Sequence, residues 1–222
     1  MKAFRGGARI LGAAGLALSS WAGVAATAPS PFEADTARHA LIVVDALVQR
    51  KSLLATQESP VVAGTLRVKT PGVRKPHDHS TKAFGEVLVF AVEPGRYRPG
   101  SVTTRMPKMQ VGTGTMDLVI PLPSDSMRAL DHVVAAGSVV YVGRIGIMTL
   151  PRAFRQNDYR FTLNRDDDRE RKVWERLLDL GKPGAWESLI QRRLDSITAE
   201  ADSIAAADTL QSPLGAPADS AR

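Results

Sequence analysis

The chain has 222 residues, of which 44% are hydrophobic, and a formal net charge of +6. Lys2, Arg5 and Arg9 supply three of these charges, and the remaining +3 is too mild to indicate a nucleic-acid partner. The absence of cysteine excludes disulfides, thiolate metal sites and a cysteine-linked lipid anchor. A body of roughly 150 ordered residues is still large enough to be stabilised by its hydrophobic core alone.

Residues 1–28 have the pattern of a secretory signal peptide. A basic start precedes an apolar stretch from Ile10 to Ala26, and small residues end it just before Pro29. The alternative is a retained membrane anchor, but the stretch is broken by glycine and serine and is short for a bilayer. We expect cleavage near Ala28, a linker over residues 29–38 and a periplasmic or secreted protein without a transmembrane span.

The middle of the chain, residues 39–164, alternates short apolar runs with Gly, Pro, Asp and Ser, which predicts strands and turns. The runs cover residues 40–47, 61–68, 86–92, 96–104, 116–122, 131–134, 138–148 and 159–163. Residues 36–49 also fit the period of a helix. The pattern predicts a mainly β protein, an antiparallel β-sandwich of about seven or eight strands.

A tight corner is predicted where the apolar run 87–92 meets Pro94 and Gly95. Proline fixes φ for the second position of a type II turn and glycine tolerates the positive φ of the third, so we expect a hairpin corner. Residues 87–92 are apolar on both faces, which predicts a central strand covered on both sides. Arg96, Tyr97 and Arg98 alternate like a strand with one face in water.

A second glycine-marked strand follows Gly137 and begins at Ser138. Strict alternation places one set of side chains on one face (Val139, Tyr141, Gly143, Ile145, Ile147) and the other set on the opposite face (Val140, Val142, Arg144, Met148). Gly143 and Gly146 indicate a bulge or a close approach of another backbone.

Together these two stretches resemble small exported bacterial β-sandwich modules, the DUF2846-like and carboxypeptidase-regulatory-like (prealbumin-type) domains. The resemblance covers about residues 64–163, and the matching residues are Pro94, Gly95, Tyr97, Gly137, Val140, Tyr141, Gly143 and Ile145. It implies a structural or binding module and supplies no catalytic residues. The chain departs from the pattern in lacking the lipid-attached cysteine and in a long excursion over residues 105–115, so membrane attachment does not carry over.

Residues 165–204 change to a helical period. One apolar stripe (Val173, Trp174, Leu177, Leu178, Leu180) follows a first turn rich in aspartate and ends at Gly181 and Pro183. A second stripe contains Trp186, Leu189, Ile190, Leu194 and Ile197. We expect an αα-hairpin packed on the β domain, rather than a single peptide-binding repeat. The composition of residues 205–222, with few large apolar side chains, predicts a flexible tail. The alternative is an Ala-rich continuation of the preceding helix to about Leu210.

The most reactive cluster in the sequence is His77, Asp78 and His79. Two imidazoles at alternate positions are potential zinc or copper ligands, and a metal carrier would bring His39 or His132 beside them. The simpler interpretation is a polar loop before the strand at Glu86, and we expect no bound metal or other cofactor. The basic and apolar stretch around Arg105 is an alternative contact point for an acidic glycan or a membrane, although a solvated loop explains it more simply.

No motif of a catalytic nucleophile is present, because the chain has no Gly-x-Ser-x-Gly elbow. The sequence therefore favours an exported, non-enzymatic accessory or binding module of the bacterial cell envelope, with an envelope protein or a glycan as partner. The alternatives are a metal-binding envelope protein that uses the His77–His79 loop and an envelope hydrolase whose site is assembled from loops.

Overall fold

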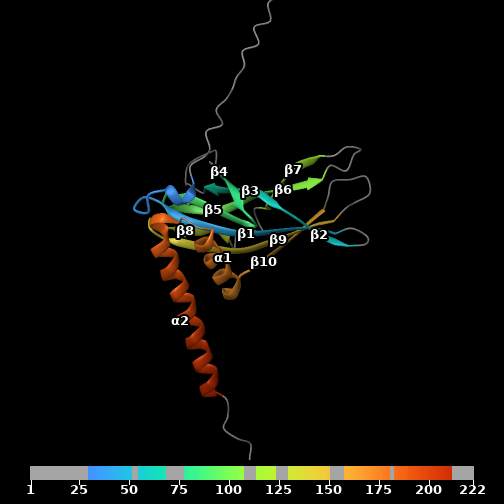
Figure 1. The fold of residues 1–222 in the computed structure, drawn as a ribbon. Coiled ribbons are helices and arrows are strands. Elements are labelled where there is room, and N and C mark those ends of the chain that lie inside the picture. Colours follow the sequence, from blue (N-terminus) through green and yellow to red (C-terminus); the bar gives the residue numbers. More distant parts are fainter. Residues whose placement is uncertain are drawn as a thin grey trace, which may run out of the picture.

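The computed structural model describes residues 30–51, 55–68, 78–107, 114–123, 130–150, 158–180 and 183–211 (Figure 1). In chain order the elements are η1 (Pro31–Glu33), β1 (Ala40–Lys51), β2 (Thr56–Ser59), β3 (Val61–Val68), β4 (Asp78–Phe84), β5 (Val87–Val92), β6 (Gly95–Pro107), β7 (Thr115–Pro121), β8 (His132–Val134), β9 (Val139–Leu150), β10 (Asp158–Asn164), α1 (Asp167–Asp179), η3 (Gly184–Trp186) and α2 (Glu187–Gln211). Within the described part of the chain, no helix combines the length and apolar character needed to cross a membrane.

The strands form a mixed sheet in the order β10-β9-β1-β5-β4-β3-β6-β7, with β2 beside β1 and β8 beside β6. β1 runs parallel to β9, and every other pairing given for the described strands is antiparallel. The sheet curls into a half-barrel (Figure 1). The mainly β prediction is therefore confirmed, but the expected antiparallel sandwich is wrong in its topology.

The core lies on both sides of the central strands. Alternate residues of β1 (Ala40, Ile42, Val44, Ala46, Val48) point into the curl, where they meet buried side chains of β3, β6, β7 and β8. On the outer face, Leu41 and Val43 pack with Val173 and Trp174 of α1 and with Ile190 of α2. β5 is likewise buried on both faces, as the sequence predicted for residues 87–92.

A β-bulge interrupts β9 at Gly143. Val43 pairs with Tyr141 and the next residue of β1, Val44, pairs with Gly143, so Val142 is skipped in the ladder. Gly143 has φ +121°, a conformation that L side chains rarely adopt. After the bulge the alternation shifts by one residue, and Ile145 and Ile147 join Val142 in the inner core. The face assignment from strict alternation is therefore wrong beyond Val142.

The predicted hairpin corner at Pro94 and Gly95 is wrong. β5 pairs with β1 and β4, whereas β6 pairs with β3, β7 and β8, so the chain crosses between two parts of the sheet here. Gly95 does not have positive φ. The crossing is held by Tyr97, which is 4% exposed and donates its hydroxyl to the Glu93 carbonyl at 2.8 Å.

The expectation that the Arg98 side chain faces water is wrong, because Arg98 is only 6% exposed. Its guanidinium forms an ion pair with the Asp131 carboxylate, and Arg96 approaches the same carboxylate at 3.1 Å. Of the three residues expected to alternate here, only Arg96 is exposed.

Two strands, β2 and β4, lie where no strand was predicted. β4 includes Asp78 and His79, for which a polar loop was expected, and Arg105 and Met106 lie in β6 rather than in a loop. His77 and residues 108–113, which make up most of the expected excursion over residues 105–115, lie outside the described residues. At the C-terminus α2 continues to Gln211, which agrees with the alternative prediction of a helical continuation to about Leu210. The rest of the predicted tail, residues 212–222, lies outside the described residues.

Candidate functional site

The sheet divides between β4 and β5, and a cleft opens at the division. β4 pairs with β5 only through Ala83 and Phe84, next to the turn at Gly85. Residues 78–82 of β4 pair instead with β3, while β5 continues along β1 as far as Val92. The two strands therefore diverge from a common hairpin.

We name this feature the β4–β5 cleft. Its volume is about 810 Å³, within the range of small-molecule binding sites. It is lined by Ser30, Pro31, Glu33, Ala34, His39, Ala63, His79, Ser80, Thr81, Lys82, Phe84, Val89, Phe90 and Ala91. Aromatic and aliphatic side chains of β5 and β4 supply an apolar floor, and the polar groups come from β4, η1 and the start of β1.

The segment around η1 forms one wall of the cleft. The ring of Phe32 packs on Phe84 of β4 with centroids 5.9 Å apart. The indole N–H of Trp186 donates to the Ala34 carbonyl at 3.1 Å and ties this wall to the helices. Two aromatic side chains from distant parts of the sequence therefore anchor this wall, the half-buried Phe84 and the buried Trp186.

His39 lies at the end of the cleft where β1 begins. Its backbone carbonyl accepts a hydrogen bond from the Gly137 N–H at 2.8 Å, and its Nδ1 lies 3.1 Å from the Asp35 carbonyl. A carbonyl is only an acceptor, so Nδ1 carries the proton and Nε2 of the neutral ring is the acceptor. Gly137, which has φ +71°, thereby positions one of the two imidazoles of the cleft.

β4 contributes polar side chains beside the cleft on both faces of the sheet. Phe84 belongs to the outer core and Ala83 packs on the inner one. By alternation, Lys82 shares the outer face with Phe84, whereas His79 shares the inner face with Ala83. The His79 ring meets Tyr97 edge-on at 5.8 Å. Lys82 is exposed and forms no ion pair with the residues that the structure describes.

The predicted metal cluster is only partly assembled. His79 and His39 line the same cleft, but Asp78 turns to Arg67 of β3 at 3.6 Å, and His132 lies elsewhere, against Arg165. Among the residues that the structure describes, no group of three His, Asp or Glu is placed to hold a metal ion. The remaining member, His77, is outside the described residues.

A buried ionic network that the sequence did not reveal joins α1 to the sheet. The carboxylate of Asp45 is fully buried and accepts from Arg169 Nε at 2.6 Å. Arg169 and Arg144 both also contact Glu86, at 3.0 and 3.3 Å. Burial, together with the negative charge of Asp45, raises the pKa of the nearby Tyr141 hydroxyl. Only the lone acid inside an apolar strand hinted at this cluster, and nothing in the sequence pairs it with Arg169.

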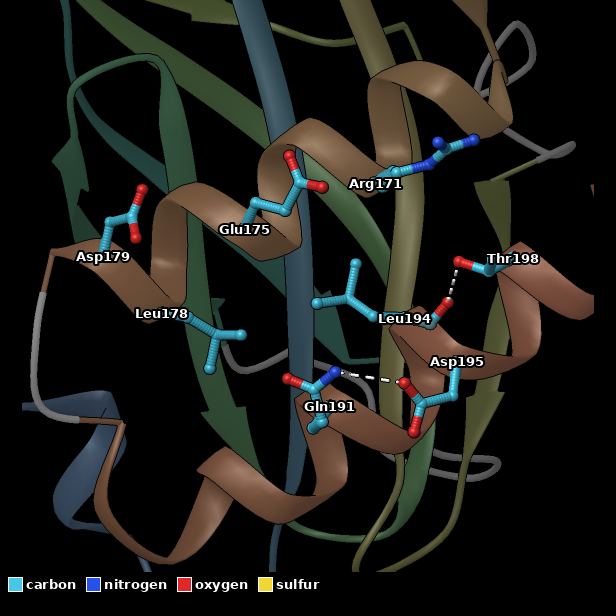
Figure 2. A pocket seen from close by; sticks show the side chains of 8 residues that line it. All are labelled: Arg171, Glu175, Leu178, Asp179, Gln191, Leu194, Asp195 and Thr198. Atoms are coloured by element: carbon cyan, nitrogen blue, oxygen red, sulfur yellow. Dashed lines mark hydrogen bonds between the residues drawn. The ribbon is translucent and has the colours of Figure 1, made fainter.

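A second, smaller depression of about 320 Å³ lies between α1 and α2 (Figure 2). Its lining is Arg171, Glu175, Leu178, Asp179, Gln191, Leu194, Asp195 and Thr198. The Gln191 amide donates to Asp195 at 3.1 Å, and the Thr198 hydroxyl donates to the Leu194 carbonyl at 3.1 Å, so its polar groups partly satisfy one another. The β4–β5 cleft is the better candidate for a ligand.

Comparisons with known proteins give no family for the chain. No family sequence model and no curated protein matches it. Among solved structures, a leucine-rich repeat protein from Bacteroides thetaiotaomicron is similar over 51% of this chain and 14% of that chain, with 13% identity and a TM-score of 0.29. A likeness this weak carries no argument about fold or function.

Proposed function

We propose that the protein is an exported, non-enzymatic binding module of the bacterial cell envelope and that the β4–β5 cleft is its ligand site. The observation that carries this proposal is the cleft itself, a volume of about 810 Å³ with an apolar floor and a polar rim. Pockets of this size and composition are the usual sites of ligands in proteins. The N-terminal signal pattern supports export.

The lining specifies the kind of ligand. Phe84, Val89 and Phe90 favour an apolar body, because burying it removes apolar surface from water. Lys82 offers a positive charge and His39 an imidazole, so the ligand also carries an anionic or hydrogen-bonding group. The His39 ring is oriented by a backbone carbonyl, whereas the base of a catalytic triad is oriented by a carboxylate, which supports binding rather than catalysis.

A fluorescent amphiphile tests the cleft directly. Anilinonaphthalene sulfonate combines an apolar body with an anion, and we expect the mature protein to bind it saturably. Ala91→Trp fills the cleft, and Lys82→Glu reverses its charge, so each should abolish or strongly weaken the signal. The matched controls, Ala199→Trp and Lys172→Glu on exposed helix positions, should bind like the parent. Equal binding by all four variants would contradict the proposed site.

Zinc binding is the second candidate, favoured by the presence of His39 and His79 in one cleft. Two imidazoles alone hold zinc weakly, since structural sites use four ligands and catalytic sites three. We expect calorimetric titration to give weak binding that His79→Ala reduces, without a change in the unfolding midpoint. Tight one-to-one binding that His77→Ala abolishes would revive the metal carrier.

A further inference from the structure

The edge of β5 that faces the cleft is not filled by another strand. The Ala46 N–H donates to the Glu86 carbonyl, so residues 88, 90 and 92 of β5 direct their backbone groups toward β1. Residues 87, 89 and 91 therefore direct theirs toward β4. Val87 meets Phe84 there, but beyond Leu88 no strand among the described residues pairs with β5 on this side.

Ala91 is the clearest open position on this edge. It is half-buried, lines the cleft and pairs with Leu41 in a position whose N–H and C=O point away from β1. Neither group forms a hydrogen bond with another described residue. The opposite wall, residues 78–82 of β4, is paired with β3 and has its own second edge directed at the cleft. Two strand edges thus face each other across the opening.

We propose that the β4–β5 cleft binds an extended peptide segment of another protein, which adds a strand beside β5. This inference rests on the proposed function and names the ligand class. Backbone donors and acceptors on one strand edge repeat every second residue, about 6.6 Å apart, and only another extended chain matches that repeat. Residues 89–91 span roughly 10 Å, enough for three or four residues of an added strand.

The side chains beside this edge define the sequence that fits. Alternate residues of an added strand would point to opposite faces, one set toward Phe84 and Val89 and the other toward Phe90 and His79. Lys82 on the outer face adds a charge that an acidic side chain complements. The fitting segment therefore alternates apolar residues and includes a glutamate or aspartate that reaches Lys82. Strand addition of this kind obtains affinity from the main chain and specificity from alternate side chains.

The test begins with selection of binders from a random-peptide display library against the mature protein. A selected peptide is synthesised and then N-methylated at single residues, which removes one backbone donor at a time. Strand addition predicts that N-methylation at alternate residues weakens binding about tenfold, the effect of one lost hydrogen bond, while the intervening residues tolerate it. Lys82→Glu should weaken binding and Lys172→Glu should not.

Amide hydrogen exchange measured by NMR supplies a second readout that does not depend on a variant that folds poorly. The peptide should slow exchange of the Ala91 amide and leave that of Phe90, already paired with β1, unchanged. The inference is overturned if N-methylation has the same effect at every peptide residue and the Ala91 amide is not protected from exchange. It is also overturned if the selection yields no peptide whose binding depends on the cleft. If the fluorescent amphiphile still binds in the cleft, only the peptide inference fails; if neither probe binds, the proposed function fails.

Discussion

At the scale of single residues, Gly143 determines how β9 meets its neighbours. The bulge leaves the Val142 carbonyl outside the β1 ladder, and Arg165 Nε donates to it at 3.0 Å. The same guanidinium reaches His132 Nε2 at 2.8 Å. Since His132 belongs to β8 and Arg165 follows β10, this one arginine connects distant parts of the curled sheet.

Gly143→Ala should destabilise the fold by roughly 1 to 3 kcal/mol, because alanine is strained at φ +121°. A Cβ there would also lie 3.0 Å from the Asn164 carbonyl. Gly95→Ala is the matched control, since Gly95 lacks positive φ and its Cβ would meet only the edge of the Tyr97 ring, at 3.2 Å. Urea unfolding should show the larger loss for Gly143→Ala, and an equal loss would contradict the account of the bulge.

The contact between His132 and Arg165 makes stability depend on pH. Burial, followed by the positive charge of Arg165, lowers the pKa of His132 below its ordinary 6.5, against the smaller effect of Asp131. The unfolded chain therefore takes up a proton at higher pH than the folded chain. The contribution is fully present above about pH 6.5 and is lost as the pH falls through the folded pKa.

His132→Gln keeps a hydrogen-bond acceptor for Arg165 but cannot titrate. We expect the free energy of unfolding to fall more between about pH 7.5 and pH 5.5 in the parent than in His132→Gln. Other histidines titrate in both proteins and cancel in the comparison. Identical pH profiles would show that His132 does not take part.

At the scale of elements, the eight strands that the sequence predicted are all present, because long apolar runs with turn-rich borders carry a strong local signal. β2 and β4 were missed because Thr56–Ser59 and Asp78–Phe84 are polar and largely exposed. Their strand conformation comes from pairing with β1 and β3, a tertiary effect that outweighs local propensity. The cleft escaped prediction for the same reason, since β4 forms one of its walls.

α1 depends on the ionic network as well as on its apolar face. Among the described residues, Arg169→Met leaves the fully buried Asp45 carboxylate with a single, longer ion pair, to Arg144 at 3.7 Å. We expect a loss of roughly 2 to 4 kcal/mol in urea unfolding, because an uncompensated buried charge is costly. The double variant Asp45→Asn with Arg169→Met should recover part of this loss. No recovery would contradict the assignment of the cost to the buried charge.

At the scale of the whole molecule, the parallel pairing of β1 and β9 could not be predicted. Seven described strands, β2 to β8, lie between them along the chain. Nothing in either apolar run distinguishes a parallel from an antiparallel neighbour. The sequence predicted a strand for each of the two runs, residues 40–47 and 138–148, with a helix over residues 36–49 as the alternative. The C-terminal helices were predictable as amphipathic, whereas the strands that they cover were not.

The N-terminal pattern predicts that the whole protein is exported. The envelope fraction of the source cell should contain the protein with its N-terminus at or near Pro29, because the small residues before it fit a signal-peptide cleavage site. N-terminal sequencing of the fractionated protein measures this. An intact Met1 in the cytosolic fraction would contradict the predicted export and the proposed role in the envelope.

The central place of β1 also sets the order of events during folding. β1 is the first described strand of the chain, yet it is flanked by β5 and by β9, whose first residue is Val139. A nascent chain that ends before β9 leaves Leu41 and Val43 without this neighbour, and loops this long close slowly. The parallel ladder between β1 and β9 therefore cannot form before the chain has been made as far as β9. This requirement suits the export proposed above, because an incompletely paired chain can pass through a narrow translocation channel.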